Sequence, residues 1–244
     1  MPPLKIATWN VNGIRARESQ VLEWVERERP DVVCLQELKS TVAQVPPSLC
    51  ELQGYRCYWH GERAYSGVGL HIRRDAFLEE PRFLHPTFDY ETRIVTAQMS
   101  DLSFVSVYVP NGGKDFPAKM KFLGEMERYV AEIHASGRRV VLCGDINITR
   151  SERDVHPKER NPALVGQRPE EREMLERILA QGLVVAHKFI IKIGCNFEQI
   201  QEFRVGSRQV VVKLAFAKQH YFDVQRNRLW FERDGAAQVH HLYG

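Results

Sequence analysis

The sequence has no long hydrophobic run and no strong charge of either sign. No apolar stretch approaches the roughly 20 residues that a membrane span requires, so we expect no membrane partner. The amino-terminal residues lack the charged-then-apolar order of a secretory signal, and we therefore expect a cytoplasmic protein. The formal net charge of +3 permits an anionic partner but does not require one.

The cysteines also lack a pattern. There are five, none stands in C-x-x-C spacing, and Cys34 and Cys143 lie inside apolar runs. This argues against a disulfide framework or a zinc site and favours buried, reduced thiols. With 244 residues, 43% of them hydrophobic, the chain is long enough for a large buried core, and we expect a single domain over residues 1–244.

The most informative stretch is Val140 to Asn147, an apolar run that ends in Gly-Asp-Ile-Asn. The run is rich in β-branched residues and too short for a helix, which predicts a buried strand. Asp145 and Asn147 stand two residues apart and therefore point to the same side of an extended chain. A carboxylate that can take a proton, beside an amide that can hold a water or a phosphate, is a candidate catalytic pair. Turn formation explains each residue equally well when it is considered alone.

The same pattern, an apolar run that ends in polar side chains, occurs upstream. A strand predicted at 4–9 is followed by Asn10 and Asn12, and a strand predicted at 31–36 is followed by Glu37. A helix predicted at 18–28 separates the two strands. This order predicts a βαβ-like unit with both strand ends at one edge, which would bring the two amides and Glu37 together. A later strand ends at Tyr108, which by default is a core aromatic residue.

The remaining periodicity completes an α/β pattern. It predicts strands near 68–72, 93–99 and 102–109, and helices that run from about 115 to 136 and from 169 to 180, with loops at 46–47, around 54 and at 149–167. From residue 184 onward the chain becomes β-rich, with strands predicted near 189–193, 210–216 and 227–233. We expect an α/β sandwich with two mixed sheets, in which 184–244 is a divergent or replaced C-terminal part.

Eight short motifs resemble one known family. They are Thr8–Arg17, Leu35–Lys39, Tyr65–Gly69, Arg93–Ile94, Tyr108–Gly112, Phe116–Lys119, Gly144–Asn147 and Pro169–Arg172. In this order and spacing, up to about residue 182, they resemble the exonuclease III and abasic-site (AP) endonuclease branch of the endonuclease/exonuclease/phosphatase superfamily. The resemblance implies a four-layer α/β/β/α sandwich. Asn-Gly-Ile-Arg-Ala-Arg at 12–17 favours the DNA-repair branch over the sphingomyelinase and inositol-phosphatase branches.

The resemblance also implies chemical roles for the strand-end residues. Glu37 would bind a divalent cation, Mg²⁺ with Mn²⁺ as the alternative, and Asn12 would lie near it. Asp145 would be the base that deprotonates the attacking water. Asn10 and Asn147 would hold Asp145 and the scissile phosphate. These oxygen-rich groups suit Mg²⁺ and the hydrolysis of an anionic phosphodiester.

The implied partner is double-stranded DNA with an abasic site or a 3′ end, cut or trimmed during base excision repair. Tyr108 would donate a hydrogen bond to a phosphate oxygen, and Arg15, Arg17 and Lys39 would contact the DNA backbone. Such a protein is expected to be a monomer, associated with the nucleoid or, in a eukaryote, with the nucleus.

Two later motifs of the family, Arg-x-Asp and Ser-Asp-His, are missing after Gly182. In the family they supply a metal-side carboxylate and a histidine that contacts the phosphate. The candidate substitutes are His220, Asp223, Asp234, His240 and His241. Because loss of one such group costs on the order of 10²–10³ in rate, a second hypothesis is a DNA-binding relative with impaired catalysis. A third is a phosphatase or lipid phosphodiesterase of the same fold.

Overall fold

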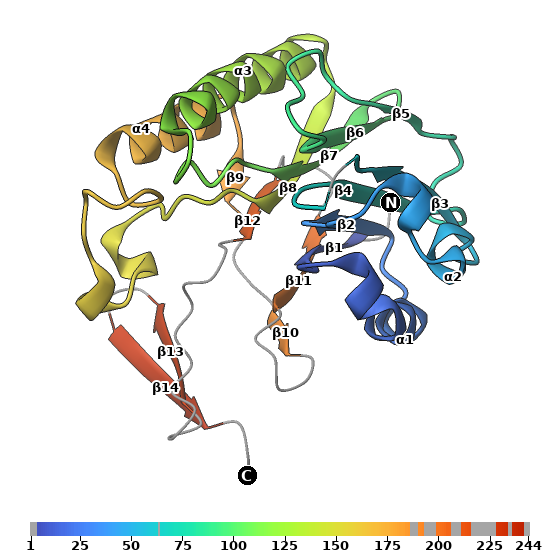
Figure 1. The fold of residues 1–244 in the computed structure, drawn as a ribbon, viewed down its shortest axis with the longest axis horizontal. Coiled ribbons are helices and arrows are strands. Elements are labelled where there is room, and N and C mark those ends of the chain that lie inside the picture. The colour runs from blue at the N-terminus through green and yellow to red at the C-terminus, as the bar shows by residue number, and fades with distance from the viewer. Residues whose placement is uncertain are drawn as a thin grey trace.

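The computed structural model describes residues 4–62 and 64–183 with their side chains. Beyond residue 183 it describes the backbone of 184–185, 190–192, 199–205, 211–215, 228–233 and 236–241. Two six-stranded sheets face each other, and helices cover the outer face of each (Figure 1). The chain therefore forms the four-layer α/β/β/α sandwich that the motifs implied.

The first sheet has the order β10-β11-β1-β2-β4-β3. Its strands are β1 (Leu4–Asn10), β2 (Val32–Gln36), β3 (Tyr55–His60), β4 (Val68–Arg73), β10 (Ile190–Lys192) and β11 (Gln199–Val205). β1 and β2 run parallel, with Asn10 opposite Gln36, and helix α1 (Glu18–Glu28) connects them. This confirms the predicted βαβ unit, and both strands end at one edge of the sheet.

The second sheet has the order β5-β6-β7-β8-β12-β9. Its strands are β5 (Arg82–Leu84), β6 (Ile94–Gln98), β7 (Leu102–Tyr108), β8 (Arg139–Asp145), β9 (Val184–Val185) and β12 (Val211–Ala215). β7 and β8 run parallel, with Tyr108 opposite Asp145, and helix α3 (Phe116–Ala135) connects them. Asp115 caps α3, because its carboxylate accepts a hydrogen bond from the amide of Ala118 at 2.9 Å. Helix α4 (Pro169–Leu179) packs beside α3.

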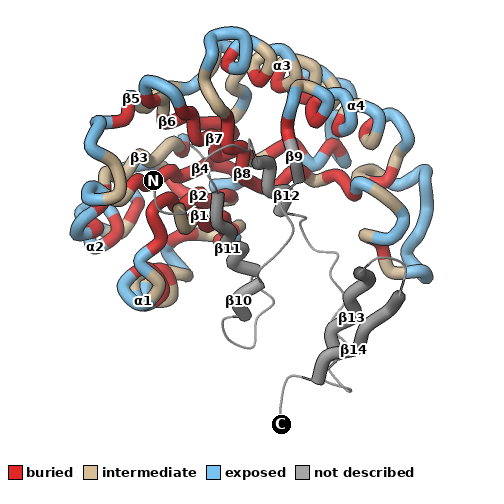
Figure 2. The backbone as a smooth tube through the Cα atoms, turned by 180° about the vertical axis from the view of Figure 1, so that it is seen from behind, coloured by how far each residue is buried: buried red, intermediate tan, exposed pale blue. Residues whose placement is uncertain are grey.

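Three clusters of buried hydrophobic residues fill the spaces between the layers. In Figure 2 the buried residues of the chain are red. The middle cluster joins the two sheets through residues such as Leu70 and Phe104, and it contains the free thiols of Cys34 and Cys143, as expected. The outer clusters pack α3 and α4 on the second sheet and α1 on the first. Among the described helices, none has the length and apolar character to cross a bilayer.

The structure departs from the sequence-based expectation in a few segments. Helix α2 (Pro47–Cys50) forms a single turn where we predicted a loop, because Pro47 at the first helical position has its φ already set for a helix. The short 3-10 helices η1 (Ile14–Arg17), η2 (Val42–Gln44), η3 (Glu152–Asp154) and η4 (Pro157–Glu159) lie in loops. Strands β13 (Arg228–Arg233) and β14 (Ala236–His241) form a separate two-stranded sheet. We predict none of the strands β3, β5, β9, β11 and β14 from the sequence.

Candidate active site

The parallel pairs β1–β2 and β7–β8, one in each sheet, end beside each other. A hydrogen bond crosses between the sheets here, from the side-chain amide of Asn10, at the end of β1, to Oδ2 of Asp145, at the end of β8, over 2.8 Å. The other oxygen of Asp145 accepts from the backbone amide of Asn147 at 3.2 Å. Asp145 is fully buried. Both carboxylate oxygens are therefore held at the carboxyl edge of the strands, where open α/β sheets bind ligands.

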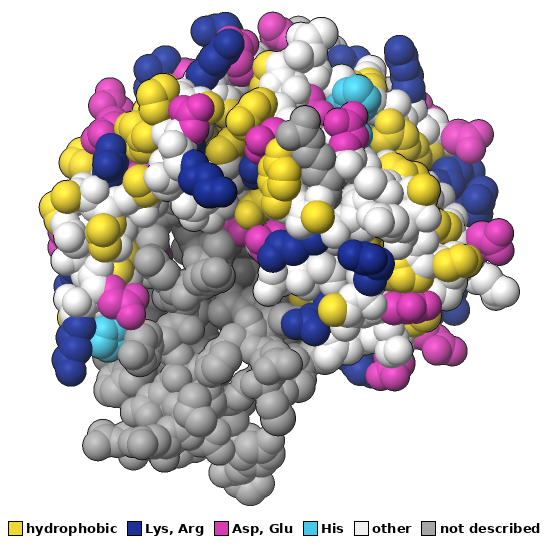
Figure 3. All heavy atoms as spheres, viewed as in Figure 1, with side chains coloured by type: hydrophobic (Ala, Val, Ile, Leu, Met, Phe, Trp, Pro, Cys, Tyr) yellow, Lys and Arg dark blue, Asp and Glu magenta, His cyan; other side chains and the backbone are white. Residues whose placement is uncertain are grey.

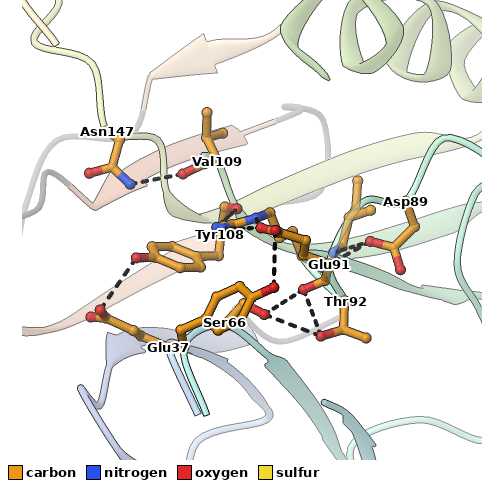
Figure 4. A network of polar contacts seen from close by, with 11 residues as sticks. Glu37, Ser66, Asp89, Glu91, Thr92, Tyr108, Val109 and Asn147 are labelled. Carbon is orange, nitrogen blue, oxygen red and sulfur yellow. Dashed lines mark hydrogen bonds and ion pairs between the residues drawn. The ribbon is translucent and has the colours of Figure 1, made fainter. Parts of the chain in front are cut away.

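The backbone conformation around Asp145 is tightly restricted. Gly144 has a φ of 152°, and a Cβ added there would overlap the carbonyl oxygen of Val107 on the neighbouring strand. Asn147 follows with a left-handed φ of 53°. Its side-chain amide donates to the carbonyl of Val109 at 2.8 Å (Figure 4), which ties the end of β8 to the end of β7. This local geometry sets the direction of the Asp145 carboxylate.

The loops that follow β1 and β2 form the other half of the edge. They lie side by side and are joined by a hydrogen bond from the amide of Gly13 to the carbonyl of Glu37 at 2.8 Å. Three non-glycine residues here have left-handed backbones: Asn12 (φ 48°), Glu37 (φ 60°) and Lys39 (φ 51°). Such residues are uncommon and concentrate where function requires a particular backbone shape.

One network joins this half to Asp145. The Tyr108 hydroxyl donates to Oε1 of Glu37 at 3.3 Å (Figure 4), and the ammonium of Lys39 lies 3.3 Å from the same oxygen. Lys39 also donates to the amide oxygen of Asn12 at 2.5 Å. The backbone amide of Asn12 donates to Oδ1 of Asn10 at 3.1 Å, which completes the link to Asp145.

Tyr108 lies between the two halves and is held as a neutral donor. Burial, with the negative charges of Glu37 and Asp145, raises the pKa of its phenol well above the ordinary value. The Arg93 guanidinium lies over the ring, 4.8 Å from its centroid, and is fixed by an ion pair with Glu91 at 2.7 Å. The hydroxyl therefore keeps its proton at neutral pH.

The Glu37 side of the network suits a hard divalent cation. A carboxylate oxygen of Glu37 and the amide oxygen of Asn12 already share one cationic group, the Lys39 ammonium. Both are the oxygen ligands that Mg²⁺ prefers, and Mg²⁺ retains several waters, so two side chains can suffice. The glutamate is 20% exposed, which leaves access for a hydrated ion. These residues fit the cation that the sequence predicts.

A second group of potential metal ligands occurs among the described residues. Ligand atoms of His60, His85 and Asp89 lie within 4.8 Å of one another. However, the two imidazole rings are stacked, with centroids 4.4 Å apart and planes at 14°, so their lone pairs lie in separate, nearly parallel planes and do not converge on one ion. The Nε2 atom of His60 is 2.5 Å from Asp89, in a close contact between the two side chains. This group is a histidine–aspartate contact rather than a competing cation site.

Seven of the nine predicted site residues thus belong to one network, and two lie next to it. Arg15 (exposed) and Arg17 (half-buried) are in η1, directly after the Asn10–Gly13 loop. Of the proposed substitutes for the missing motifs, His220, Asp223 and Asp234 lie outside the described residues. His240 and His241 are in β14, of which only the backbone is described.

Our sequence reasoning assigned no role to a buried ion pair behind the network. Lys119 of α3 and Glu171 of α4 are both fully buried, and Nζ lies 2.5 Å from Oε1. A signal was available, since Lys119 stands four and seven residues before Leu123 and Met126 in the apolar stripe of α3. A lysine on the buried face of a helix requires a partner.

The fold and the edge network together define the class: an α/β/β/α sandwich with carboxylate, amide and phenol groups gathered where strands of the two sheets end. The model of the Endonuclease/Exonuclease/phosphatase family matches residues 7–230, and the chain belongs to this family. Curated relatives include DNA repair nuclease APEX1 of Danio rerio, 31% identical over 187 residues, which cover 73% of this chain and 60% of that protein. Exodeoxyribonuclease III of Haemophilus influenzae is 29% identical over 195 residues, 74% of this chain and 73% of that protein.

Solved structures agree with this membership and with the predicted branch. A variant of the 3′ phosphatase NExo from Neisseria, bound to product DNA hairpin, has a TM-score of 0.65 and 27% identity, over 73% of this chain and 71% of that one. The chain spans only part of several relatives, including 27% of recombination repair protein 1 of Drosophila melanogaster. The resemblance to the exonuclease III and AP endonuclease branch is confirmed.

Proposed function

We propose that the protein is a Mg²⁺-dependent DNA phosphodiesterase that incises DNA at abasic sites and trims 3′ ends during base excision repair. It would act at the nucleoid or, in a eukaryote, in the nucleus. The observation that carries this proposal is the hydrogen bond from Asn10 to the buried carboxylate of Asp145. It joins the two sheets at the edge where Glu37 and Tyr108 also meet.

Asp145 serves as the base in this proposal. Hydrogen bonds from Asn10 and from the amide of Asn147 fix its two oxygens. The carboxylate can therefore take a proton from a water while that water attacks phosphorus and the bond to the leaving oxygen breaks. The side-chain amide of Asn147 has two N–H groups, so one can bond Val109 while the other faces a phosphate oxygen.

Tyr108 and the cation site neutralise charge on the phosphate. The raised pKa keeps the Tyr108 hydroxyl protonated, which suits a donor to a phosphoryl oxygen in a transition state that gains negative charge. Glu37 and Asn12 would hold Mg²⁺, or Mn²⁺ in its place. The bound ion would supply positive charge at the phosphoryl oxygens.

The DNA backbone would be bound by Arg15, Arg17 and Lys39, which come from the loops beside the network. On the face seen in Figure 3, the described Lys and Arg side chains lie among Asp and Glu side chains, without one continuous basic stripe. Binding is therefore expected to be moderate and to weaken with salt. The DNA hairpin bound to the Neisseria 3′ phosphatase supports a DNA substrate for this fold.

A direct test uses a synthetic duplex with one abasic site and a second duplex with a recessed 3′ end. We expect incision of the first and trimming of the second in Mg²⁺, and no reaction in EDTA. The matched variants are Glu37→Gln, which removes the charge that holds the cation, and Glu51→Gln, which removes an exposed charge from the end of α2. The second variant should retain full activity.

The outcomes separate the competing functions. Wild-type incision no higher than that of Glu37→Gln would refute the nuclease proposal. If the protein then still bound the duplex, the DNA-binding relative without catalysis would replace it. Cleavage of inositol phosphates or sphingomyelin in preference to DNA would favour the phosphatase or lipid phosphodiesterase.

A further inference from the structure

The buried ion pair between Lys119 and Glu171 lies directly behind the end of β8. Beyond its ion pair, the Lys119 ammonium donates to the carbonyl of Asn147 at 2.7 Å and to the carbonyl of Asn111 at 3.2 Å. Asn111 follows β7 and Asn147 follows β8. One ammonium group thus bonds both loops that carry the second sheet's half of the site.

Glu171 fixes the position of that ammonium. Its second oxygen accepts hydrogen bonds from the amides of Gly166, at 2.6 Å, and Arg168, at 3.2 Å. The aliphatic part of Lys119 is confined as well, because a Cβ added at Gly112 would lie 2.7 Å from its Cδ. The ammonium has little room to move away from Asn147.

Stability alone is a weak reason for such a pair. Burial opposes the charged form of Lys119 and lowers its pKa, while Glu171 opposes that shift. Replacing a buried ion pair with apolar residues of similar volume is often neutral or stabilising. A buried pair of this kind is better explained by the backbone shape that it enforces.

The backbone that it contacts is the one that sets Asp145. Asn147 has a left-handed φ of 53°, and its amide donates to Oδ1 of Asp145. Lys119 bonds the carbonyl of the same residue, so it holds the peptide unit on the other side of Asn147. We propose that Lys119 and Glu171 are positioning residues, which orient Asn147 and through it the Asp145 carboxylate toward the attacking water. This inference rests on the proposed nuclease function.

The test separates positioning from stability with a double variant. Lys119→Met alone leaves a buried carboxylate without its cationic partner and is expected to lower Tm by about 10 °C. Lys119→Met/Glu171→Gln removes both charges, while the introduced glutamine retains an acceptor for the Gly166 and Arg168 amides. It should recover most of the Tm. Its kcat for incision of the abasic duplex should remain about 10- to 100-fold below wild type, as expected for about 1 Å of misplacement, with KM for DNA within about twofold.

A matched control exists on the same two helices. Arg177 of α4 and Glu127 of α3 form an exposed ion pair at 2.7 Å. The double variant Arg177→Met/Glu127→Gln removes an α3–α4 ion pair without contact to Asn147, and it should retain the wild-type kcat. Glu171→Asp keeps both charges, but its side chain is one methylene shorter, so the carboxylate lies farther from Lys119. This variant should fold with a kcat lowered about threefold to tenfold.

Each outcome decides the inference. The inference is refuted if the Lys119→Met/Glu171→Gln variant has the wild-type kcat, that is, if kcat recovers together with Tm. It is also refuted if the Arg177→Met/Glu127→Gln control loses kcat to the same extent. If the double variant does not fold, wild-type kcat in folded Glu171→Asp would refute it. Failure of the nuclease proposal itself is distinguishable, because the wild-type protein would then show no incision in Mg²⁺ above the Glu37→Gln background.

Discussion

The two halves of the candidate site are built differently. The half that follows β8 is buried: Asp145, Lys119 and Glu171 are all 0% exposed. The half that follows β2 is open, with the side chains of Glu37 and Lys39 at 20% and 35% exposure. In the buried half, the side chains of Asp145 and Lys119 bond backbone atoms of the strand-end loops, whereas in the open half the side chains of Glu37 and Asn12 share one ammonium group.

This difference corresponds to two kinds of chemistry. A base must keep one orientation relative to a water and a phosphorus atom, and small displacements reduce its rate strongly. A cation site must exchange a hydrated ion and therefore needs access to solvent. Variants in the buried half are thus expected to change kcat, and variants in the open half to change the dependence on Mg²⁺ and salt.

The largest effect is expected at Asp145. Asp145→Asn retains the size of the side chain and an oxygen for Asn10, but it removes the group that takes the proton from water. We expect kcat for the abasic duplex to fall by about 10³-fold or more, with duplex affinity little changed and Tm lowered, because the new NH2 group replaces the oxygen that accepts from the Asn147 amide. Single-turnover incision and fluorescence anisotropy measure these quantities. A folded variant with more than about a tenth of wild-type kcat would show that another group is the base.

The next effect tests the residue between the two halves. Tyr108→Phe removes the hydroxyl that donates to Glu37 and leaves the ring under Arg93. We expect kcat to fall by about 10²-fold, because a protonated donor to the phosphate is lost, while the free energy of unfolding changes by only about 1 kcal/mol. Chemical denaturation provides the second value. A loss of stability without a loss of kcat would indicate that the hydroxyl only holds Glu37 in place.

The sequence predicted much of this arrangement, and the part that it missed has a physical explanation. Apolar periodicity reports which face of an element is buried, so β1, β2, β7, β8, α1, α3 and α4 followed from it directly. Motif order then grouped Asn10 with Asp145, although 135 residues separate them. Partner choice inside the fold was not predicted. Nothing in local spacing shows that Lys119 meets Glu171, because that contact depends on how α3 packs against α4.

The open half was also only partly predicted. Residue types suggested that Glu37 and Asn12 bind a cation and that Lys39 contacts DNA. The structure places the Lys39 ammonium between the two oxygens, and all three residues have left-handed backbones. Glutamate and lysine residues in loops give no sequence signal for such a backbone, whereas glycine does.

A smaller effect is therefore expected for Lys39→Met. Without an ammonium between Glu37 and Asn12, Mg²⁺ has no competitor for their oxygens. We expect the half-saturating Mg²⁺ concentration to fall about threefold to tenfold, since an ion pair near the surface contributes about 1 kcal/mol. The slope of log affinity against log salt should decrease by about 1 if Lys39 also contacts a phosphate. Lys121→Met, in an exposed position on α3, should change neither value. Unchanged Mg²⁺ dependence would mean that the cation binds elsewhere.

The smallest effect on activity is expected at His71, in the first sheet and away from the candidate site. A variant at this position separates the pH dependence of folding from that of catalysis. His71 on β4 is 1% exposed, and burial lowers its pKa from 6.5 to about 3. The folded protein therefore keeps His71 neutral, while the unfolded chain binds a proton below about pH 6.5. Stability should decrease as pH falls from about 6.5 toward about 3, by up to about 1.4 kcal/mol per pH unit from this group.

His71→Met should remove this component, so that the wild-type protein loses stability faster than the variant between about pH 6.5 and about pH 5 in urea unfolding. The two proteins should show parallel behaviour above about pH 7.5, where the histidine is neutral in both states. The ring packs against Trp59 at 4.3 Å between centroids and contacts neither half of the site, so kcat at neutral pH should not change in the folded variant. Identical pH slopes in the two proteins would show that His71 is protonated in the fold. If the variant still loses activity at a low pH where it remains folded, that loss is caused by groups in the site and not by unfolding.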